Sequence, residues 1–338
     1  MEELLSNGHH ESLPESYILP VDKRPDLIIN KAIPVIDLAA HNHEQTAMQI
    51  LQAGKEYGFF QVVNHGIEEE VIREMLKISK EFFQLPIEEK AVYFSEDANK
   101  YPRLHTSTTH VNKLEKKFWR DYFRFVSHPV NPQSMDQWPQ IPTSFREIAP
   151  KYSKVARELG LKILKFIAQG LKLDDNYFNG EVSDTSIVNI NFYPQCPDPS
   201  LALGLISHCD PNLITVLLPD DQVNGLQVLH HGDWIAVDPI PNAFVINVGH
   251  QLEFITNGLL KSVEHRAVTS STMSRISIAT FIYPSSECVI GPAKQLIDEK
   301  NGPIFREFEL KEFMSIYHGS IGDTANIMDA FKIKALSL

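Results

Sequence analysis

The chain has 338 residues, 43% of them hydrophobic, and a formal net charge of -12. This length can bury a substantial core in one large domain or two. The acidic balance offers no basic excess to neutralise phosphates, so we expect neither nucleic acid nor an anionic membrane as a partner. No run of about 18 apolar residues occurs, which argues against a transmembrane helix.

Targeting and redox signals are weak. The start, MEELLSNGHHESLPES, is acidic and polar, unlike a signal peptide or an Arg-rich transit peptide. Cys196, Cys209 and Cys288 are too few for a disulfide framework and contain no C-x-x-C pair. We therefore expect reduced thiols and a cytoplasmic location.

The first half of the chain alternates helical and extended patterns. Residues 1–30 are expected to form a loosely ordered arm. A short strand at 33–38, a helix at 44–57, a buried strand at 58–66 and a helix at 67–83 follow. Residues 118–125 alternate as a strand, and a long helix is predicted at 144–171. That strand would place Trp119, Asp121 and Phe123 on one face and Arg120, Tyr122 and Arg124 on the other.

From 186 to 288 the pattern becomes strictly alternating. Seven short strands are separated by Gly, Pro, Asn and Asp, with no intervening helix predicted. The fold class is therefore α+β, mainly β, with a double-stranded β-helix (jelly-roll) core. We expect an N-terminal helical and strand region at 1–180, the core at 181–290, and a C-terminal helical segment at 291–338 that could fold over the barrel mouth as a lid.

The H-C-D triplet at 208–210 is the first candidate site. His208 and Asp210 would point the same way at a strand end, while Cys209 points the other way. They could form two thirds of a 2-His-1-carboxylate iron site, which leaves positions open for substrate and oxygen. The alternative is a surface pair, because 14 histidines supply on the order of one H-x-D by chance.

His265 is the best third ligand, because it lies inside an alternating strand, although a metal-free core histidine is an equal alternative on spacing alone. The competing histidines have simpler explanations. His65 is a turn residue, and His230 and His231 before Gly232 indicate a solvated turn.

The strand at 275–283 carries an unusual face. Its odd positions place a guanidinium, a hydroxyl and two aromatic rings in a row, namely Arg275, Ser277, Ala279, Phe281 and Tyr283. A buried arginine needs an anion, so a dicarboxylate held by Arg275 and Ser277 is one solution and an internal salt bridge is the other. The strand at 186–193 similarly groups Asn189, Asn191 and Tyr193, which either line a pocket or form a solvated face.

Together these residues resemble the H-x-D…H and R-x-S motifs of plant Fe(II)- and 2-oxoglutarate-dependent dioxygenases. The resemblance runs in order along nearly the whole chain, through IPVIDL, GFFQVVNHGI, EFFQLPIEEK, WRDYFR, NFYPQCPDPSLALGLISHCDPNLITVLL, GLQVLHHGDWIAVDPIPNAFVIN and SVEHRAV. LPESYILPVDKRP and residues 102–125 are most similar to the group of downy-mildew-resistance-type salicylate hydroxylases, hyoscyamine 6-hydroxylase and deoxypodophyllotoxin synthase.

The resemblance implies a residue for each part of the site. His208, Asp210 and His265 would bind Fe(II), Arg275 with Ser277 would hold the distal carboxylate of 2-oxoglutarate, and Tyr193 and Asn191 would assist that co-substrate. O2 would take the remaining position, and ascorbate would support activity. The implied substrate pocket is apolar with one cationic corner, formed by Tyr122, Phe123, Arg124, Phe281 and Tyr283.

The resemblance further implies a monomeric oxidoreductase that hydroxylates a small specialised plant metabolite, phenolic or alkaloid, and releases succinate and CO2. The alternatives are a same-fold oxidase performing ring closure, desaturation or epoxidation, including one that uses no 2-oxoglutarate, and a non-catalytic metabolite-binding protein.

Two positions depart from the family pattern. Cys209 stands where relatives usually carry Thr or Ser, and alternation turns it away from the metal. His250 follows Gly249 where relatives commonly have Asp, so it could alter a contact around the ligands or the choice of substrate, or it could be solvated.

Overall fold

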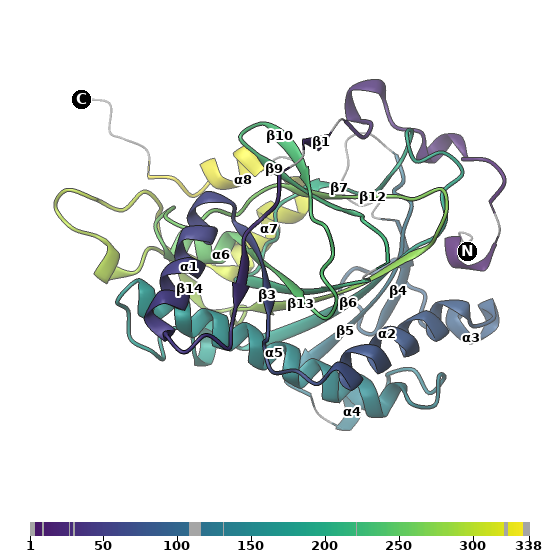
Figure 1. The fold of residues 1–338 in the computed structure, drawn as a ribbon, viewed down its shortest axis with the longest axis horizontal. Helices are drawn as coiled ribbons and strands as arrows, with labels where there is room; N and C mark the ends of the chain where they lie inside the picture. Colours follow the sequence, from purple (N-terminus) through teal and green to yellow (C-terminus); the bar gives the residue numbers. More distant parts are fainter. Residues whose placement is uncertain are drawn as a thin grey trace.

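The computed structural model describes residues 4–8, 10–26, 28–29, 31–107, 116–130, 132–220, 222–320 and 324–333. Two β-sheets face each other and form the predicted jelly roll (Figure 1). The smaller sheet has the order β1 (Ile28–Ile29), β10 (Asp233–Ala236), β9 (Leu226–His230), β12 (His265–Val268) and β7 (Leu203–His208). The larger has the order β2 (Val35–Asp37), β3 (Phe59–Val63), β11 (Phe244–Val248), β8 (Ile214–Pro219), β13 (Arg275–Tyr283), β6 (Thr185–Tyr193), β5 (Asp121–His128) and β4 (Arg103–Thr106).

Three long helices cover the outer face of the larger sheet (Figure 1). They are α1 (His43–Glu56), α2 (Glu69–Gln84) and α5 (Phe145–Gly170). The short α3 (Ile87–Ala91) and α4 (Pro132–Asp136) lie beyond them, and α7 (Leu310–Ser320) and α8 (Thr324–Asp329) follow the two-stranded ribbon of β14 (Val289–Ile290) and β15 (Phe308–Glu309). None of the described helices is long and apolar enough to span a membrane.

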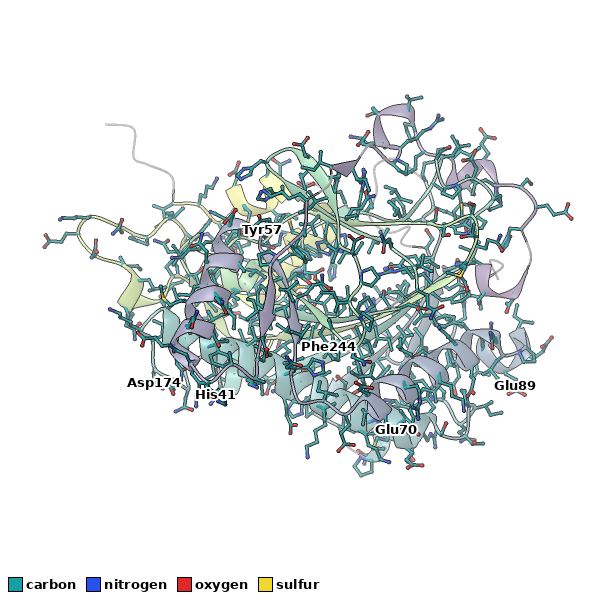
Figure 2. The ribbon with its side chains drawn as sticks, viewed as in Figure 1. His41, Tyr57, Glu70, Glu89, Asp174 and Phe244 are labelled. Carbon is teal, nitrogen blue, oxygen red and sulfur yellow. The ribbon has the colours of Figure 1, made fainter. Side chains whose placement is uncertain are left out.

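Apolar spacing explains why these segments are helices. On α2, Ile72, Met75, Ile78 and Phe82 recur every three or four residues and are all buried. The exposed positions are polar, and Figure 2 shows Glu70 on α2 and Glu89 on α3 at the outer surface. The main hydrophobic cluster draws residues from the N-terminal helices, the barrel and the C-terminal segment. The predicted division of the chain into an N-terminal region (1–180), a jelly-roll core (181–290) and a C-terminal segment (291–338) stays a prediction.

Period-two alternation divides the larger sheet into an apolar outer side and a polar inner side. On β13, Ile276, Ile278 and Ile282 join the main cluster under the helices. Their neighbours Arg275 and Ser277 point into the barrel, because alternate residues of a strand face opposite sides. The inner side is therefore where polar chemistry collects.

The N-terminal arm is anchored, so the expectation of a loose arm is wrong for its described part. Its short turns η1 (Leu5–Asn7), η2 (Glu15–Tyr17) and η3 (Val21–Lys23) are irregular, yet Leu5 and Tyr17 are buried. The backbone N–H groups of Leu5 and Ser6 donate to the buried carboxylate of Asp121 at 3.2 and 2.7 Å. Residues 1–3, 9, 27 and 30 of the predicted arm lie outside the described residues.

Two further expectations about the barrel region are wrong. A helix, α6 (His250–Ile255), interrupts the series of strands; all six of its residues are buried, so it shows no helical periodicity. His230 is 5% exposed, and its ring stacks on Tyr57 with centroids 4.5 Å apart. Only His231, exposed with a φ of 52°, occupies the solvated turn.

We expect substitution of Gly160 on α5 to destabilise the fold. A Cβ at this position would lie 2.4 Å from Cδ1 of Ile282 and 3.2 Å from Cγ2 of Val216. Gly160→Val should therefore lower the free energy of unfolding, measured in urea, by about 1–3 kcal/mol. Gly319→Val on α7 is the control, because nothing lies within 4 Å of its Cβ. Equal losses in both variants would contradict close packing at Gly160.

Candidate active site

The strand register brings two histidines together. His265, at the start of β12, is the direct antiparallel partner of His208, at the end of β7. Asp210 follows two residues after the end of β7, and its Oδ1 lies 3.4 Å from Nε2 of His208 and 3.6 Å from Nε2 of His265. The three ligand atoms lie within 4.8 Å of one another, and no second such group of three occurs in the described ranges.

Backbone carbonyls orient both imidazole rings. Nδ1 of His208 donates to the carbonyl of Ile206 at 2.8 Å, and Nδ1 of His265 donates to that of Val263 at 3.2 Å. A carbonyl can only accept, so Nδ1 carries a proton in each ring, and Nε2 keeps its lone pair when the ring is neutral. Both lone pairs are thus available on the side of Asp210, as metal-binding histidines require.

The larger sheet holds the carboxylate of Asp210. Its Oδ2 accepts hydrogen bonds from Oγ1 of Thr215 at 2.5 Å and from Nδ2 of Asn247 at 2.7 Å. Burial alone would raise the pKa of Asp210, but the two histidines and the Thr215 hydroxyl lower it well below its usual range. Burial, together with His208, lowers the pKa of His265 to about 4. An ionised carboxylate with a neutral His265 imidazole and the ring of His208 beside it fits a divalent iron ion.

Arg275 lies on the inner side of the larger sheet and has no anionic partner among the residues that the structure describes. It is 5% exposed, its guanidinium lies over the Tyr193 ring at 5.2 Å, and its buried Nε has no hydrogen-bond partner. No carboxylate of the described residues lies within ion-pair distance of it. The internal salt bridge is therefore absent there, and an external dicarboxylate fits the site.

The polar residues around Arg275 are buried, which excludes a solvated sheet face. Ser277 is the register partner of Asn191, and the Asn191 amide lies 3.5 Å from Oγ of Ser277. Gly225 makes room for the arginine, because a Cβ there would lie 2.7 Å from Cδ of Arg275.

Four of the five predicted pocket residues lie on the inner side of the larger sheet. Tyr122 and Arg124 pair with Asn191 and Asn189 of β6, and Phe281 and Tyr283 continue the inner face of β13. Phe123 does not belong with them. It is fully buried on the outer side, 4.7 Å from Phe82 and 5.9 Å from Phe145 between ring centroids. Adjacent strand residues point to opposite sides, so placing Phe123 in the pocket was wrong.

Cys209 and His250 both lie beside the ligands. As predicted, Cys209 is turned away, with Sγ 3.5 Å from the carbonyl of Ser262. Its own carbonyl accepts a hydrogen bond from the Tyr317 hydroxyl of α7 at 2.9 Å. His250 is fully buried, so the solvated alternative is wrong; its backbone N–H donates to the Asp210 carbonyl at 2.8 Å, and burial lowers its side-chain pKa to about 4.

Sequence reasoning missed Thr215, Asn247 and Tyr317. Asn247 could have been found from the sequence, because it is the one amide in the apolar strand FVINV, and a buried amide needs a hydrogen-bond partner. Thr215 is its register partner on β8. Tyr317 comes from a distant helix, and no local pattern connects it with Cys209.

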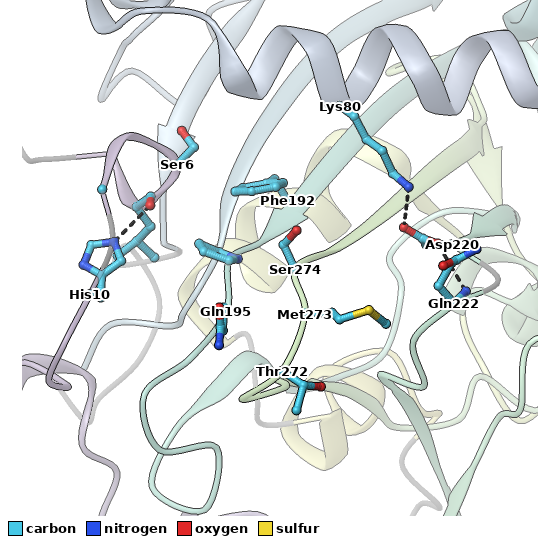
Figure 3. Close-up of a pocket in the computed structure, with 13 residues that line it drawn as sticks. Ser6, His10, Lys80, Phe192, Gln195, Asp220, Gln222, Thr272, Met273 and Ser274 are labelled. Atoms are coloured by element: carbon cyan, nitrogen blue, oxygen red, sulfur yellow. Dashed lines mark hydrogen bonds and ion pairs between the residues drawn. The ribbon is translucent and has the colours of Figure 1, made fainter.

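A separate cleft of about 470 Å³ lies outside this group (Figure 3). The N-terminal arm contributes Ser6 and His10, and α2 contributes Lys80, which forms an ion pair with Asp220 at 3.1 Å. None of the three candidate metal ligands lines it. Two of its lining residues, Phe192 and Ser274, are chain neighbours of Tyr193 and Arg275. The cleft nevertheless lies apart from the candidate metal ligands, so its volume does not identify the active site.

Comparison with known proteins gives the family. Residues 184–284 match the 2OG-Fe(II) oxygenase superfamily, and residues 33–141 match the non-haem dioxygenase in morphine synthesis N-terminal family. The chain is 44% identical to the 2'-deoxymugineic-acid 2'-dioxygenase of Hordeum vulgare, with 98% of each chain covered. The chain belongs to the plant 2OG-Fe(II) dioxygenase family.

Other members of the family agree with this assignment. The dioxygenase is 40% identical to Protein DOWNY MILDEW RESISTANCE 6 of Arabidopsis thaliana, covering 97% of this chain and 98% of that protein. It is 38% identical to the hyoscyamine 6-dioxygenase of Hyoscyamus niger, covering 98% and 99%. The crystal structure of JOX2 in complex with 2OG, Fe, and JA matches with a TM-score of 0.86 and 32% identity, covering 98% and 96%.

The dioxygenase is thus an oxidoreductase that uses Fe(II) and 2-oxoglutarate, and the predictions of family, fold class, enzyme class and these cofactors are confirmed. A small-molecule substrate is also supported. The monomeric state and the cytoplasmic location stay predictions.

We expect the hydroxyl of Thr215 to tune iron binding. Thr215→Val keeps the shape of the side chain but removes a hydrogen bond to Oδ2 of Asp210, so Fe(II) affinity should fall by about tenfold or more. Anaerobic calorimetric titration with Fe(II) measures this, and Thr143→Val at an exposed position is the matched control. If Thr215→Val bound Fe(II) as tightly as the parent protein, the hydrogen bond from Thr215 to Asp210 would have no role in metal binding.

We expect the space at Gly225 to tune 2-oxoglutarate binding. Gly225→Ala would displace the Arg275 side chain and should weaken the binding of 2-oxoglutarate about tenfold, as loss of a charge-assisted hydrogen bond does. The measurement is the dissociation constant of 2-oxoglutarate, with Gly302→Ala as a control because nothing lies within 4 Å of its Cβ. A variant that binds as tightly as the parent would show that Arg275 does not hold the co-substrate.

Proposed function

We propose that this dioxygenase hydroxylates a small specialised plant metabolite, with phenolics and alkaloids as the first classes to test, and releases succinate and CO2. The observation that supports it best is the pairing, inside one barrel, of a 2-His-1-carboxylate group with a buried arginine that lacks an anion. The first group suits a metal with open positions, and the second suits a dicarboxylate.

Each part of the site then has a role. His208, Asp210 and His265 would hold Fe(II) through their two imidazoles and the carboxylate. When bound, Fe(II) and 2-oxoglutarate supply the oxidising chemistry with O2, in which the co-substrate loses CO2 and becomes succinate. Arg275 and Ser277 orient the distal carboxylate of 2-oxoglutarate, and Tyr193 and Asn191 support them from the paired strand.

The remaining inner face positions the substrate. Tyr122, Phe281 and Tyr283 provide aromatic walls, and Arg124 provides a cationic corner. A cavity with these walls would exclude water and would fix which atom of a small molecule faces the metal group. The same machinery serves desaturation, epoxidation or ring closure if the substrate is placed differently, so these outcomes remain the alternative. A purely non-catalytic binder has no need of the intact ligand set.

The names of relatives do not select a substrate class. They include a deoxymugineic-acid dioxygenase at 44% identity, a flavanone 3-dioxygenase at 40% and a hyoscyamine 6-dioxygenase at 38%. These differences in identity are too small to favour one chemistry, so the cavity must be tested directly.

We expect a panel of phenolics, alkaloids and terpenoids, incubated with Fe(II), ascorbate, 2-oxoglutarate and the enzyme, to yield one product that has gained an oxygen atom. Mass spectrometry should show succinate rising together with that product. His208→Ala should abolish both, because it removes a metal ligand, whereas His231→Ala at the exposed turn should not.

Two results would contradict the proposal. Unchanged turnover in His208→Ala would refute the metal assignment. A product formed without succinate would refute the role of 2-oxoglutarate.

A further inference from the structure

A second cation stands on the inner side of the larger sheet, away from Arg275. Arg124 of β5 is the register partner of Asn189 on β6, which in turn faces Ala279 on β13. Ala279 lies four residues along β13 from Arg275, about 13 Å, and Arg124 lies two strands away from β13, about 10 Å. The two arginine backbone positions are therefore separated by about 16 Å.

Arg124 has no anion of its own within the described ranges. Its Nε donates to Oδ1 of Asn189 at 3.1 Å, and it also hydrogen-bonds with the hydroxyl of Tyr101. Both partners are neutral, and no described carboxylate lies within ion-pair distance. A half-buried guanidinium held only by neutral groups retains unmet attraction for a negative charge.

The surroundings raise the positive potential further. The Tyr122 ring has three guanidiniums around it, at 4.9 Å for Arg120, 5.5 Å for Arg124 and 5.8 Å for Arg103. This concentration of cations occurs inside a protein whose net charge is -12. Arg124 therefore lies in a region that is rich in cationic side chains.

The surroundings of Arg124 also include residues that lie near the candidate metal ligands. The Tyr283 hydroxyl lies within electrostatic range of both Arg124 and Asp210, and so does that of Tyr317. Burial raises the pKa of Tyr283, so its hydroxyl stays protonated and able to donate. The Tyr317 hydroxyl donates to the carbonyl of Cys209, next to Asp210, so Arg124 lies on the inner face of the sheet with neighbours that extend to the candidate metal ligands.

We propose that Arg124 binds the carboxylate of the substrate, so that this dioxygenase acts on ring-bearing organic acids. 2-Oxoglutarate does not account for this cation, since one end of it belongs at Arg275 and the other at the metal. A carboxylate can accept two parallel hydrogen bonds from a guanidinium, with Tyr101 and Tyr283 as further donors. The aromatic walls of Tyr122 and Phe281 fit the ring of such an acid. This inference rests on the proposed function and narrows its substrate class.

The test uses the holoenzyme under anaerobic conditions, loaded with Fe(II) and 2-oxoglutarate so that nothing is turned over. A mixed library of aromatic and alicyclic carboxylic acids is equilibrated with the protein by dialysis, beside the same library after methylation to esters. Mass spectrometry identifies the retained compounds. We expect at least one acid to be retained about tenfold more strongly than its ester, which removes the charge but keeps the ring.

The variants test the residue itself. Arg124→Gln should weaken retention of the selected acid at least tenfold, in line with the loss of a charged hydrogen bond, and should remove the preference over the ester. Arg124→Lys should keep part of the preference, because it keeps the charge but not the planar fork. Arg73→Gln on the exposed face of α2 is the control and should bind as the parent does.

Three outcomes would overturn the proposal: retention of esters as strongly as acids, no retained acid, or an Arg124→Gln variant that binds the acid unchanged. The first two need only the parent protein, so a poorly folded variant does not block the test. Succinate formation by the parent protein distinguishes a failure of the proposed function from a failure of the proposed role of Arg124. Retained acids without succinate would refute the proposed function alone, whereas succinate without a preference for acids would refute only the role of Arg124.

Discussion

The carboxylate of Asp210 joins the two sheets of the barrel, and the site depends on this contact. One oxygen accepts hydrogen bonds from Thr215 and Asn247 of the larger sheet, and the other faces the two histidines of the smaller sheet. Leaving a buried ionised carboxylate unpaired would cost several kcal/mol. The strand register supplies these partners in both sheets. Asn247 is opposite Thr215 in the larger sheet, and His265 is opposite His208 in the smaller sheet. A one-residue slip in either pair would turn these side chains to the other face.

Alternation also explains how one sheet serves two environments. Its outer side supplies apolar residues to the helices, and its inner side collects amides, hydroxyls and cations. Arg275 and Arg124 both lack a carboxylate partner in the described part of the chain, so the interior attracts anions although the whole protein is acidic. Many acidic residues lie at the surface, as Asp174 does in Figure 2, whereas the buried carboxylates of Asp121 and Asp210 are held by hydrogen bonds. The two arginines without a carboxylate partner among the described residues thus favour anionic small molecules inside the barrel.

The sequence predicted most features that follow from the alternation of side chains along a strand. It predicted few of the contacts between elements that are distant in the chain. The strand pattern placed Arg275, Ser277 and Asn191 on inner faces, and the H-x-D spacing aligned the first two ligands. Phe123 was misplaced because the family resemblance covered three consecutive residues, whereas alternation allows only Tyr122 and Arg124 to face inward. Fully buried segments such as α6 lose the amphipathic signal that identifies a helix. A solvated His250 was therefore one of the alternatives that the sequence left open.

Part of the proposed substrate pocket lies outside the strands that carry the candidate metal ligands. The candidate metal ligands and Arg275 lie on β7, β12 and β13 or directly after them, inside the jelly roll. Arg124 lies on β5, Tyr101 just before β4, and Tyr317 on α7, all outside the strands that carry the ligands. Substitutions on these flanking elements can change the charge and shape of the cavity without moving the strand register that fixes Asp210. Under the proposed role of Arg124, substitutions on β5 would change the preference for an anionic substrate and leave the strands of the metal ligands unaltered.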